Sequence, residues 1–347
     1  MRNSVLLIVG LCTFMCGALA LGPPLSTAEL EDQTRFGPDP GDAALRILSS
    51  TDTEVFAPII EAYLADQPDL SIVYDVAGSA DIVELLAACE GCYDIVISSA
   101  MDLQMKLAND GAARPLPDLD PAPWAVWRES LFGFTLEPAT ILLNAAHFKD
   151  RPIPQTRQEL IATLRAEPET FAGRVGTYDV RLSGLGYLFA TQDARTSETY
   201  WRLMEVFGSL EAKLYCCSGE MIDALAAGEL LVAYNVLGSY ANARLDARGL
   251  IEIVAPQDFA TTMMRTALVL DSAAAPERAE AFVAHLVSNA WARETGGTEV
   301  DAAPLPPLSR ASPPQQGLIR LEPGLLVYLD TLKRKIFLEE WRNALRR

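Results

Sequence analysis

The stretch G-R-V-G-T-Y-D-V-R-L-S-G-L-G-Y-L-F, residues 173–189, predicts a short buried strand that ends in a polar loop and then a helix. Ser183 is a residue type that caps helices, and Gly184 and Gly186 leave room for a ligand beside the backbone. A helix N-terminus offers unpaired N–H donors at the positive end of the helix dipole, so this loop suits an anion. A plain strand-to-helix turn, common in α/β proteins, is the alternative.

The same order of strand, serine-bearing loop and helix recurs along the chain. Similar loops follow the apolar runs 44–48, 70–76 and 93–97, and another precedes the helix predicted for 220–227. This repetition predicts parallel β-α units in an α/β fold. Ligands of open parallel sheets bind beyond the carboxyl ends of the strands, so the loops should line one crevice. The ligand-binding residues predicted in these loops are Ser49, Ser50, Thr51, Ser79, Ser98, Ser99, Ser183, Gly184 and Ser218.

Four residues outside the serine positions are also predicted to bind the ligand. Tyr234 and Asn235 end an apolar strand at the edge where the loops gather, so their polar groups need partners there. Arg181 and Arg265 each lie next to a predicted cleft loop and are the best cations for an anionic ligand. In so acidic a chain, each arginine could instead pair with a neighbouring carboxylate, and both interpretations stay open.

Length and charge limit the classes of function. The chain has 347 residues and a formal charge of −18, and half of its residues are hydrophobic. These values predict a globular protein of about two domains. The negative charge argues against a nucleic-acid partner, because affinity for phosphate chains comes mainly from lysine and arginine. A small anion remains compatible, since it responds to a few local donors.

Signatures of catalysis are weak. A cleft rich in serine could hold a hydrolytic nucleophile, but the sequence contains no G-x-S-x-G and no H-E-x-x-H motif. His147 and His285 are far apart in sequence and fit structural positions better than catalytic or metal-binding ones. The pair Gly184 and Gly186 begins a dinucleotide-binding pattern, but Phe189 stands where the third glycine should be. We therefore expect no enzyme, no cofactor and no bound metal.

The N-terminal residues indicate export. Arg2, an apolar run and the sequence Ala18-Leu19-Ala20 predict a secretory signal peptide over residues 1–20, with an uncleaved anchor as the alternative. Residues 21–42 are rich in proline, glycine and acids and are expected to form a flexible lead-in. The remainder is predicted to form lobe 1 from residues 43–137 and 252–347, and lobe 2 from residues 138–251.

Export changes the meaning of the four cysteines that follow the leader. In an oxidising compartment they are more typical of disulfides than of metal ligands. Cys89 and Cys92 flank a glycine at a helix-to-strand turn, within bridging range. Cys216 and Cys217 are adjacent, so a bridge between them closes a strained ring that is easily reduced. We predict the pairs Cys89–Cys92 and Cys216–Cys217, because a cross-pair would tie the lobes together.

Five segments resemble, in this order, motifs of a known family: residues 47–51, 93–100, 176–186, 228–235 and 265–269. The chain resembles bacterial extracellular solute-binding proteins of the type II periplasmic class, in the iron, thiamine, polyamine and phosphonate group associated with ABC transporters. The resemblance covers about residues 44–295. It implies a type II periplasmic-binding-protein fold, with two α/β lobes joined by crossover strands and a ligand closed between them without catalysis.

The resemblance also implies a location and partners. It implies a periplasmic monomer that binds a small carboxylate- or phosphate-bearing solute and delivers it to an ABC transporter permease. Some relatives instead present their solute to a membrane sensor kinase. Ferric-binding members use adjacent tyrosines, whereas this sequence has Tyr234-Asn235 with Tyr240 six residues after Tyr234, so iron is an alternative ligand.

Overall fold

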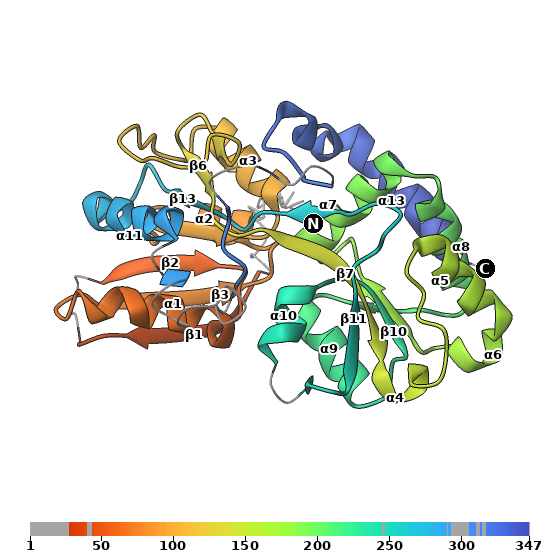
Figure 1. Cartoon of the computed structure of the whole chain (residues 1–347). Coiled ribbons are helices and arrows are strands. Elements are labelled where there is room, and N and C mark those ends of the chain that lie inside the picture. Colours follow the sequence, from red (N-terminus) through yellow and green to blue (C-terminus); the bar gives the residue numbers. More distant parts are fainter. Residues whose placement is uncertain are drawn as a thin grey trace, which may run out of the picture.

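The computed structural model describes residues 28–39, 44–244, 247–289, 291–292, 305–309, 313 and 317–346. Within these residues the chain forms two lobes, each built on a β-sheet with helices packed against it (Figure 1). The signal peptide predicted for residues 1–20 lies outside the described residues. Among the helices that are described, none combines the length and the apolar character needed to cross a membrane.

Lobe 1 contains a seven-stranded sheet in the order β1-β3-β2-β4-β13-β6-β5. The central strand β2 pairs in parallel with β3 and β4, as the repeated β-α units predict, and the outer strands pair antiparallel. Its strands are β1 (Leu30–Phe36), β2 (Leu45–Ser49), β3 (Ile72–Ala77), β4 (Ile95–Ser98), β5 (Val126–Trp127), β6 (Leu131–Gly133) and β13 (Thr266–Val269). Its helices are α1 (Thr53–Ala65), α2 (Ile82–Ala88), α3 (Met101–Asn109) and α11 (Pro276–Ser288).

Strand β1 corrects the expectation of a flexible lead-in. Leu30–Phe36 pairs antiparallel with β3 at the edge of the sheet. The strand is mostly exposed, so apolar burial does not explain it. Backbone pairing and side-chain contacts hold it instead: Nε2 of Gln33 donates to Oδ1 of Asp75 at 2.8 Å, and Oγ1 of Thr53 donates to Asp32. Polar edge strands of this kind carry little hydrophobic signal in a sequence.

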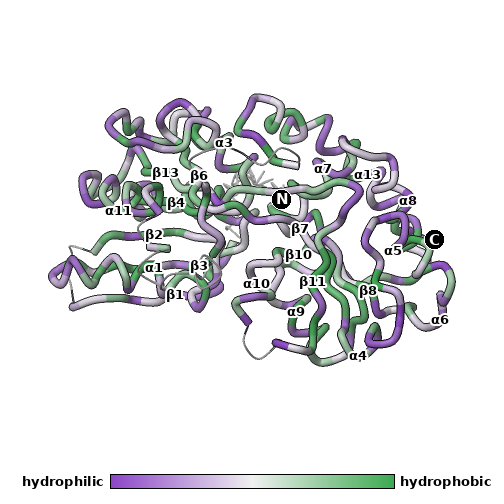
Figure 2. The backbone as a smooth tube through the Cα atoms, in the orientation of Figure 1, coloured by the Kyte–Doolittle hydropathy of each residue, from purple (hydrophilic) through white to green (hydrophobic). Residues whose placement is uncertain are grey.

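Lobe 2 contains a six-stranded sheet in the order β11-β7-β10-β8-β9, with β12 also paired to β7. Figure 2 shows that its central strands are mainly hydrophobic. Its strands are β7 (Glu137–Asn144), β8 (Val175–Tyr178), β9 (Lys213–Tyr215), β10 (Val232–Leu237), β11 (Ile251–Val254) and β12 (Thr262–Met263). Its helices are α4 (Ala145–Phe148), α5 (Arg157–Ala166), α6 (Pro168–Phe171), α7 (Gly184–Thr196), α8 (Thr199–Ser209), α9 (Ser218–Ala226) and α10 (Gly238–Ala243).

Two strand segments connect the sheets of the two lobes. The chain enters lobe 2 through β7 and returns through β12, whose Met263 pairs with Glu137, into β13 of lobe 1. The predicted return at residue 252 is wrong, because β11 pairs antiparallel with β7 and so belongs to the sheet of lobe 2. A strand pattern alone does not say which sheet the strand will join.

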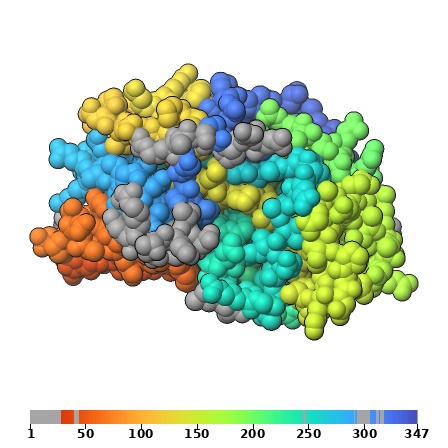
Figure 3. Space-filling model, viewed as in Figure 1, coloured from red at the N-terminus to blue at the C-terminus, as the bar shows by residue number. Residues whose placement is uncertain are grey.

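The C-terminal segment corrects the predicted extent of lobe 1. Pro323–Leu329 forms the 3-10 helix η3, and α13 (Thr331–Leu345) packs against α8 of lobe 2. Figure 3 shows the dark blue C-terminal segment over the top of the molecule, beside the green residues of lobe 2. Phe337 and Trp341 of α13 are buried in the core of lobe 2. The C-terminal helix therefore belongs to lobe 2 and not, as residues 252–347 were assigned, to lobe 1.

Replacing Phe337 by alanine should destabilise the protein by about 3–5 kcal/mol, the usual range for removing a large buried aromatic side chain. Its ring lies 5.5 Å from the ring of Tyr187 and 5.7 Å from that of Tyr328, centroid to centroid. Leu332→Ala is the matched control on the same helix, because Leu332 is 64% exposed, and should cost at most about 0.5 kcal/mol. Denaturant unfolding followed by circular dichroism measures both. Equal losses would mean that α13 is not docked on lobe 2.

Candidate functional site

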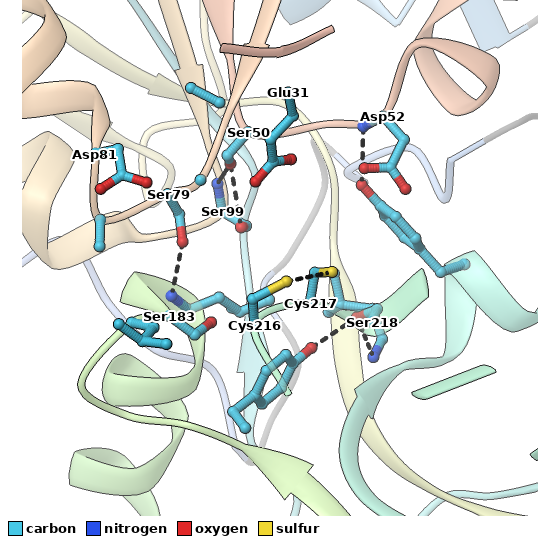
Figure 4. Close-up of a pocket in the computed structure, with 18 of the residues that line it drawn as sticks. Glu31, Ser50, Asp52, Ser79, Asp81, Ser99, Ser183, Cys216, Cys217 and Ser218 are labelled. Carbon is cyan, nitrogen blue, oxygen red and sulfur yellow. Dashed lines mark hydrogen bonds between the residues drawn. The ribbon is translucent and has the colours of Figure 1, made fainter. Parts of the chain in front are cut away.

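A cavity of about 310 Å³ lies between the two lobes (Figure 4). Lobe 1 lines it with β1 and with the loops that follow β2, β3 and β4. Lobe 2 lines it with the loop before α7, the loop between β9 and α9, and two tyrosines, Tyr178 and Tyr240. The loops of both lobes therefore meet at one place, as the order of strands and helices predicts.

Six of the thirteen predicted ligand-binding residues line this cavity. Ser183 caps α7, since its Oγ accepts a hydrogen bond from the backbone N–H of Gly186 at 3.1 Å. Ser218 begins α9, and its Oγ lies 2.6 Å from the hydroxyl of Tyr178. Each of these two side chains stands at a helix N-terminus that faces the cavity. The six residues are Ser50, Ser79, Ser99, Arg181, Ser183 and Ser218.

Four other predicted residues do not line the cavity: Ser49, Thr51, Ser98 and Gly184. Oγ of Ser49 accepts a hydrogen bond from the backbone N–H of Thr51 at 3.0 Å, and Oγ of Ser98 accepts one from that of Ala100 at 3.1 Å. These bonds shape the loops that carry the lining serines. Gly184 permits a close approach of the lobes, because a Cβ atom there would lie 3.1 Å from Oγ of Ser79.

Tyr234 and Asn235 do not reach the cavity, contrary to the prediction. Both side chains lie inside lobe 2, where Tyr234 Oη donates to Asp193 Oδ2 at 2.7 Å and accepts from Arg157 Nε at 2.6 Å. Nδ2 of Asn235 donates to the same Asp193 oxygen at 2.9 Å. Burial and the Asp193 carboxylate raise the pKa of Tyr234 well above its ordinary value. These polar tips find their partners in a buried network instead of in a ligand.

The two predicted arginines differ in environment. Arg265 is fully buried and forms an ion pair with Glu137, with Nε 3.1 Å from Oε1, so it does not line the cavity. Burial opposes its charge, but Glu137 outweighs this and raises the pKa of Arg265. Arg181 is half-exposed on the cavity wall, and its Nε donates to Oδ1 of Asp179 at 2.8 Å. The ion-pair interpretation therefore holds for Arg265, and Arg181 combines a pair with access to the cavity.

Three carboxylates that the sequence interpretation missed line the lobe 1 wall: Glu31, Asp52 and Asp81. Burial raises the pKa of Glu31, and the carboxylates of Asp52, Asp81 and Glu220 raise it further. Burial likewise raises the pKa of Asp52 and of Asp81. Asp52 and Asp81 directly precede predicted helices, which was an available signal. Glu31 gave none, because its segment read as a flexible lead-in.

The cysteines follow one of the two predicted pairings. Cys89 and Cys92 form a disulfide with their Cα atoms 5.6 Å apart, across a turn in which Gly91 adopts a positive φ of 76°. Cys216 and Cys217 are free, with their sulfur atoms 2.7 Å apart. The predicted second bridge is therefore wrong, because adjacent cysteines would have to close a strained ring. Both free thiols line the cavity.

The lobes touch each other beside the cavity. The backbone N–H of Leu185 in lobe 2 donates to Oγ of Ser79 in lobe 1 at 3.2 Å. The backbone N–H of Asp52 in lobe 1 donates to Oη of Tyr240 in lobe 2 at 3.3 Å. Both contacts are drawn in Figure 4. The arrangement is closed, so a bound solute would contact both lobes at once.

Comparison with known proteins gives a consistent family. Residues 45–293 match the model of a family described as bacterial extracellular solute-binding protein. The substrate-binding protein of an ABC transporter from Agrobacterium tumefaciens is 29% identical with a TM-score of 0.82, covering 92% of this chain and 100% of that one. No curated protein sequence matches the chain.

Two more distant structures share the fold. AfuA from Actinobacillus pleuropneumoniae, solved with fructose-6-phosphate, is 15% identical with a TM-score of 0.66, covering 87% of this chain and 98% of that one. Iron-bound HitA from Pseudomonas aeruginosa is 14% identical with a TM-score of 0.63, covering 87% and 99%. At such identities the likeness concerns the fold alone. It confirms the predicted two-lobe periplasmic-binding-protein fold.

Replacing Glu31 by glutamine should stabilise the ligand-free protein at neutral pH, because it removes a negative charge that faces other carboxylates. The pKa of Glu31 is raised in the folded protein. The ionised Glu31 carboxylate therefore destabilises the folded protein. This effect is absent below the pKa of Glu31 in the unfolded chain and is complete once pH exceeds its pKa in the folded protein. The gain should stay below about 1 kcal/mol, because the Glu31 side chain on the cavity wall keeps enough contact with water for solvent to screen its charge.

Melting temperatures at about pH 4 and about pH 8 test this. The gain should appear only at the higher pH. Glu169→Gln, at an exposed carboxylate of α6 outside the cavity, is the control and should change neither value. A stabilisation by Glu31→Gln that is equal at both pH values would contradict the electrostatic explanation.

Proposed function

Since the chain belongs to the family of bacterial extracellular solute-binding proteins, we propose that it captures a small polar solute between its lobes in the periplasm and delivers it to an ABC transporter permease. The observation that carries this proposal is the cavity, which is lined by both lobes and flanked by lobe-to-lobe hydrogen bonds. The full-length similarity to an ABC transporter substrate-binding protein supports the partner.

An anionic group of the solute, a carboxylate or a phosphate, is proposed to lie against lobe 2. That wall offers the guanidinium of Arg181 and the N-termini of α7 and α9, with the hydroxyls of Ser183 and Ser218. Backbone N–H groups at helix N-termini and guanidinium groups are strong partners for such anions. The pair between Arg181 and Asp179 lowers the net positive charge there, so hydrogen bonds would carry much of the recognition.

The rest of the solute is proposed to offer hydrogen-bond donors to lobe 1. The carboxylates of Glu31, Asp52 and Asp81 on that wall accept hydrogen bonds and repel a second anionic group. Hydroxyl groups of a sugar or a polyol would satisfy them. A phosphorylated or acidic sugar combines both ends, and AfuA, of the same fold, was solved with fructose-6-phosphate.

Ferric iron is not favoured by the geometry. Among the residues predicted for iron, the hydroxyl of Tyr234 bonds to Arg157 and Asp193 inside lobe 2. Tyr240 does line the cavity, where its hydroxyl accepts a hydrogen bond from Asp52. The hydroxyls of Tyr234 and Tyr240 therefore lie in different places. They do not form the adjacent pair of tyrosine ligands that ferric-binding members use.

Binding of the proposed solute should raise the melting temperature, because a ligand that prefers the folded state stabilises it by mass action. A thermal-shift panel of sugar phosphates, sugar acids, inorganic phosphate and unmodified sugars identifies the class. Small-angle scattering with the best member should show a smaller radius of gyration than without it, as expected for closure of an open population. A panel in which unmodified sugars shift the melting temperature as much as sugar phosphates would contradict the anionic group.

Arg181→Ala should weaken binding of the best panel member about tenfold or more, the effect of losing a hydrogen bond to a charged group. Arg181→Lys should restore only part of the affinity, since an ammonium lacks the planar fork of guanidinium. Calorimetric titration measures both. Arg151→Ala is the matched control, because Arg151 pairs with Glu167 on the surface of lobe 2, Nη1 to Oε1 at 2.6 Å, outside the cavity. Equal affinities for the Arg181→Ala and Arg151→Ala proteins would remove Arg181 from the site.

A further inference from the structure

Two thiols on the lobe 2 wall of the cavity lie close to a carboxylate. The sulfur atoms of Cys216 and Cys217 and a carboxylate oxygen of Glu220 all lie within 4.8 Å of one another. Within the residues that the structure describes, this is the one group of three such side chains close enough to share a metal ion. The solute-binding function proposed above makes no use of it.

The local fold brings the three side chains together. Cys216 and Cys217 follow β9, and Cys217 is the N-cap of α9, whose first turn contains Glu220. The adjacent cysteines are free, and a disulfide between them would be strained and easily reduced. Both thiols are partly exposed on the cavity wall, so an ion from solution can reach them.

The charges at this point favour a cation. The carboxylate of Glu220 places a negative charge beside the two thiols, which a bound cation would neutralise. A coordinated cation deprotonates the thiols, which release their protons to solvent. Across the cavity, the carboxylate of Glu31 points from lobe 1 toward the two cysteines in Figure 4. Glu31 lines the same cavity as the two cysteines, from the opposite lobe.

We propose that Cys216, Cys217 and Glu220 bind a soft cation of the zinc or copper(I) type, with Glu31 completing its coordination from the opposite lobe. Thiolates select such metals over hard cations such as magnesium or calcium. Zinc takes four ligands in a tetrahedron, so three ligands from lobe 2 leave one position directed into the cavity. A ligand from lobe 1 at that position means that the bound cation joins the lobes.

Cadmium is the probe for this site, because its thiolate complexes absorb in the ultraviolet. Titrating Cd²⁺ into the protein with its Cys89–Cys92 disulfide intact and no reductant added should produce a sulfur-to-cadmium absorption that saturates at one equivalent, and added Zn²⁺ should displace it. The double substitution C216S/C217S should abolish the absorption. The matched control C89S/C92S removes the other described cysteine pair and should leave the absorption unchanged. Absorption that persists in C216S/C217S, or that is missing from the native protein, would overturn the proposal.

The carboxylates are tested in the same titration. E220Q and E31Q should each weaken cadmium binding at least about tenfold, since even residues that only orient metal ligands have effects of this size. Unchanged affinity in E220Q would remove Glu220 from the site, and unchanged affinity in E31Q would overturn the joining of the lobes. Melting temperatures of the metal-free variants show that they are folded. The outcome does not depend on the solute, because sugar phosphates are absent from the titration.

Discussion

A buried ion pair holds together the two strand segments that connect the sheets of the lobes. Glu137 begins β7, and Arg265 lies between β12 and β13, so each belongs to one connection. The pair is fully buried, with Nε and Nη2 of Arg265 each 3.1 Å from a Glu137 oxygen. Arg265 also donates to Thr51 of lobe 1, and Ser239 of lobe 2 donates to Glu137. Removing either partner would leave a buried charge, at a cost of about 3–5 kcal/mol.

The strength of this connection contrasts with the weak contacts at the mouth of the cavity. Two hydrogen bonds join the lobes there, from Leu185 to Ser79 and from Asp52 to Tyr240. Each is worth only about 0.5–1.5 kcal/mol net. The ion pair therefore holds the two connecting strands together, whereas the contacts beside the cavity cost little free energy to break.

The sequence predicts the parts of this architecture that depend on local pattern. Short apolar runs followed by serine predicted the parallel strands of lobe 1, and the cap at Ser183 is confirmed. Features set by distant partners were missed. Strand β1 is exposed and is held by its pairing with β3, and the hydroxyl of Tyr234 is taken by Arg157, 77 residues away in sequence. Neither contact produces a periodic or compositional signal in the sequence. The sequence therefore predicts the serines that line the cavity but not the carboxylates.

Because closure would bring the two walls of the cavity together, their different side chains bear on which solutes favour the closed state. Lobe 1 presents carboxylates such as Glu31 and Asp52, whereas lobe 2 presents Arg181, serine hydroxyls and the thiols. A solute shifts the equilibrium toward closure only by as much as it prefers the closed state over the open one. A ligand that bonds to only one wall binds equally well when the lobes are apart, so it does not favour the closed state. A solute with two different ends, or the proposed cation between Glu31 and the thiols, would gain affinity when the walls meet, so the division of chemistry between the lobes would favour such ligands.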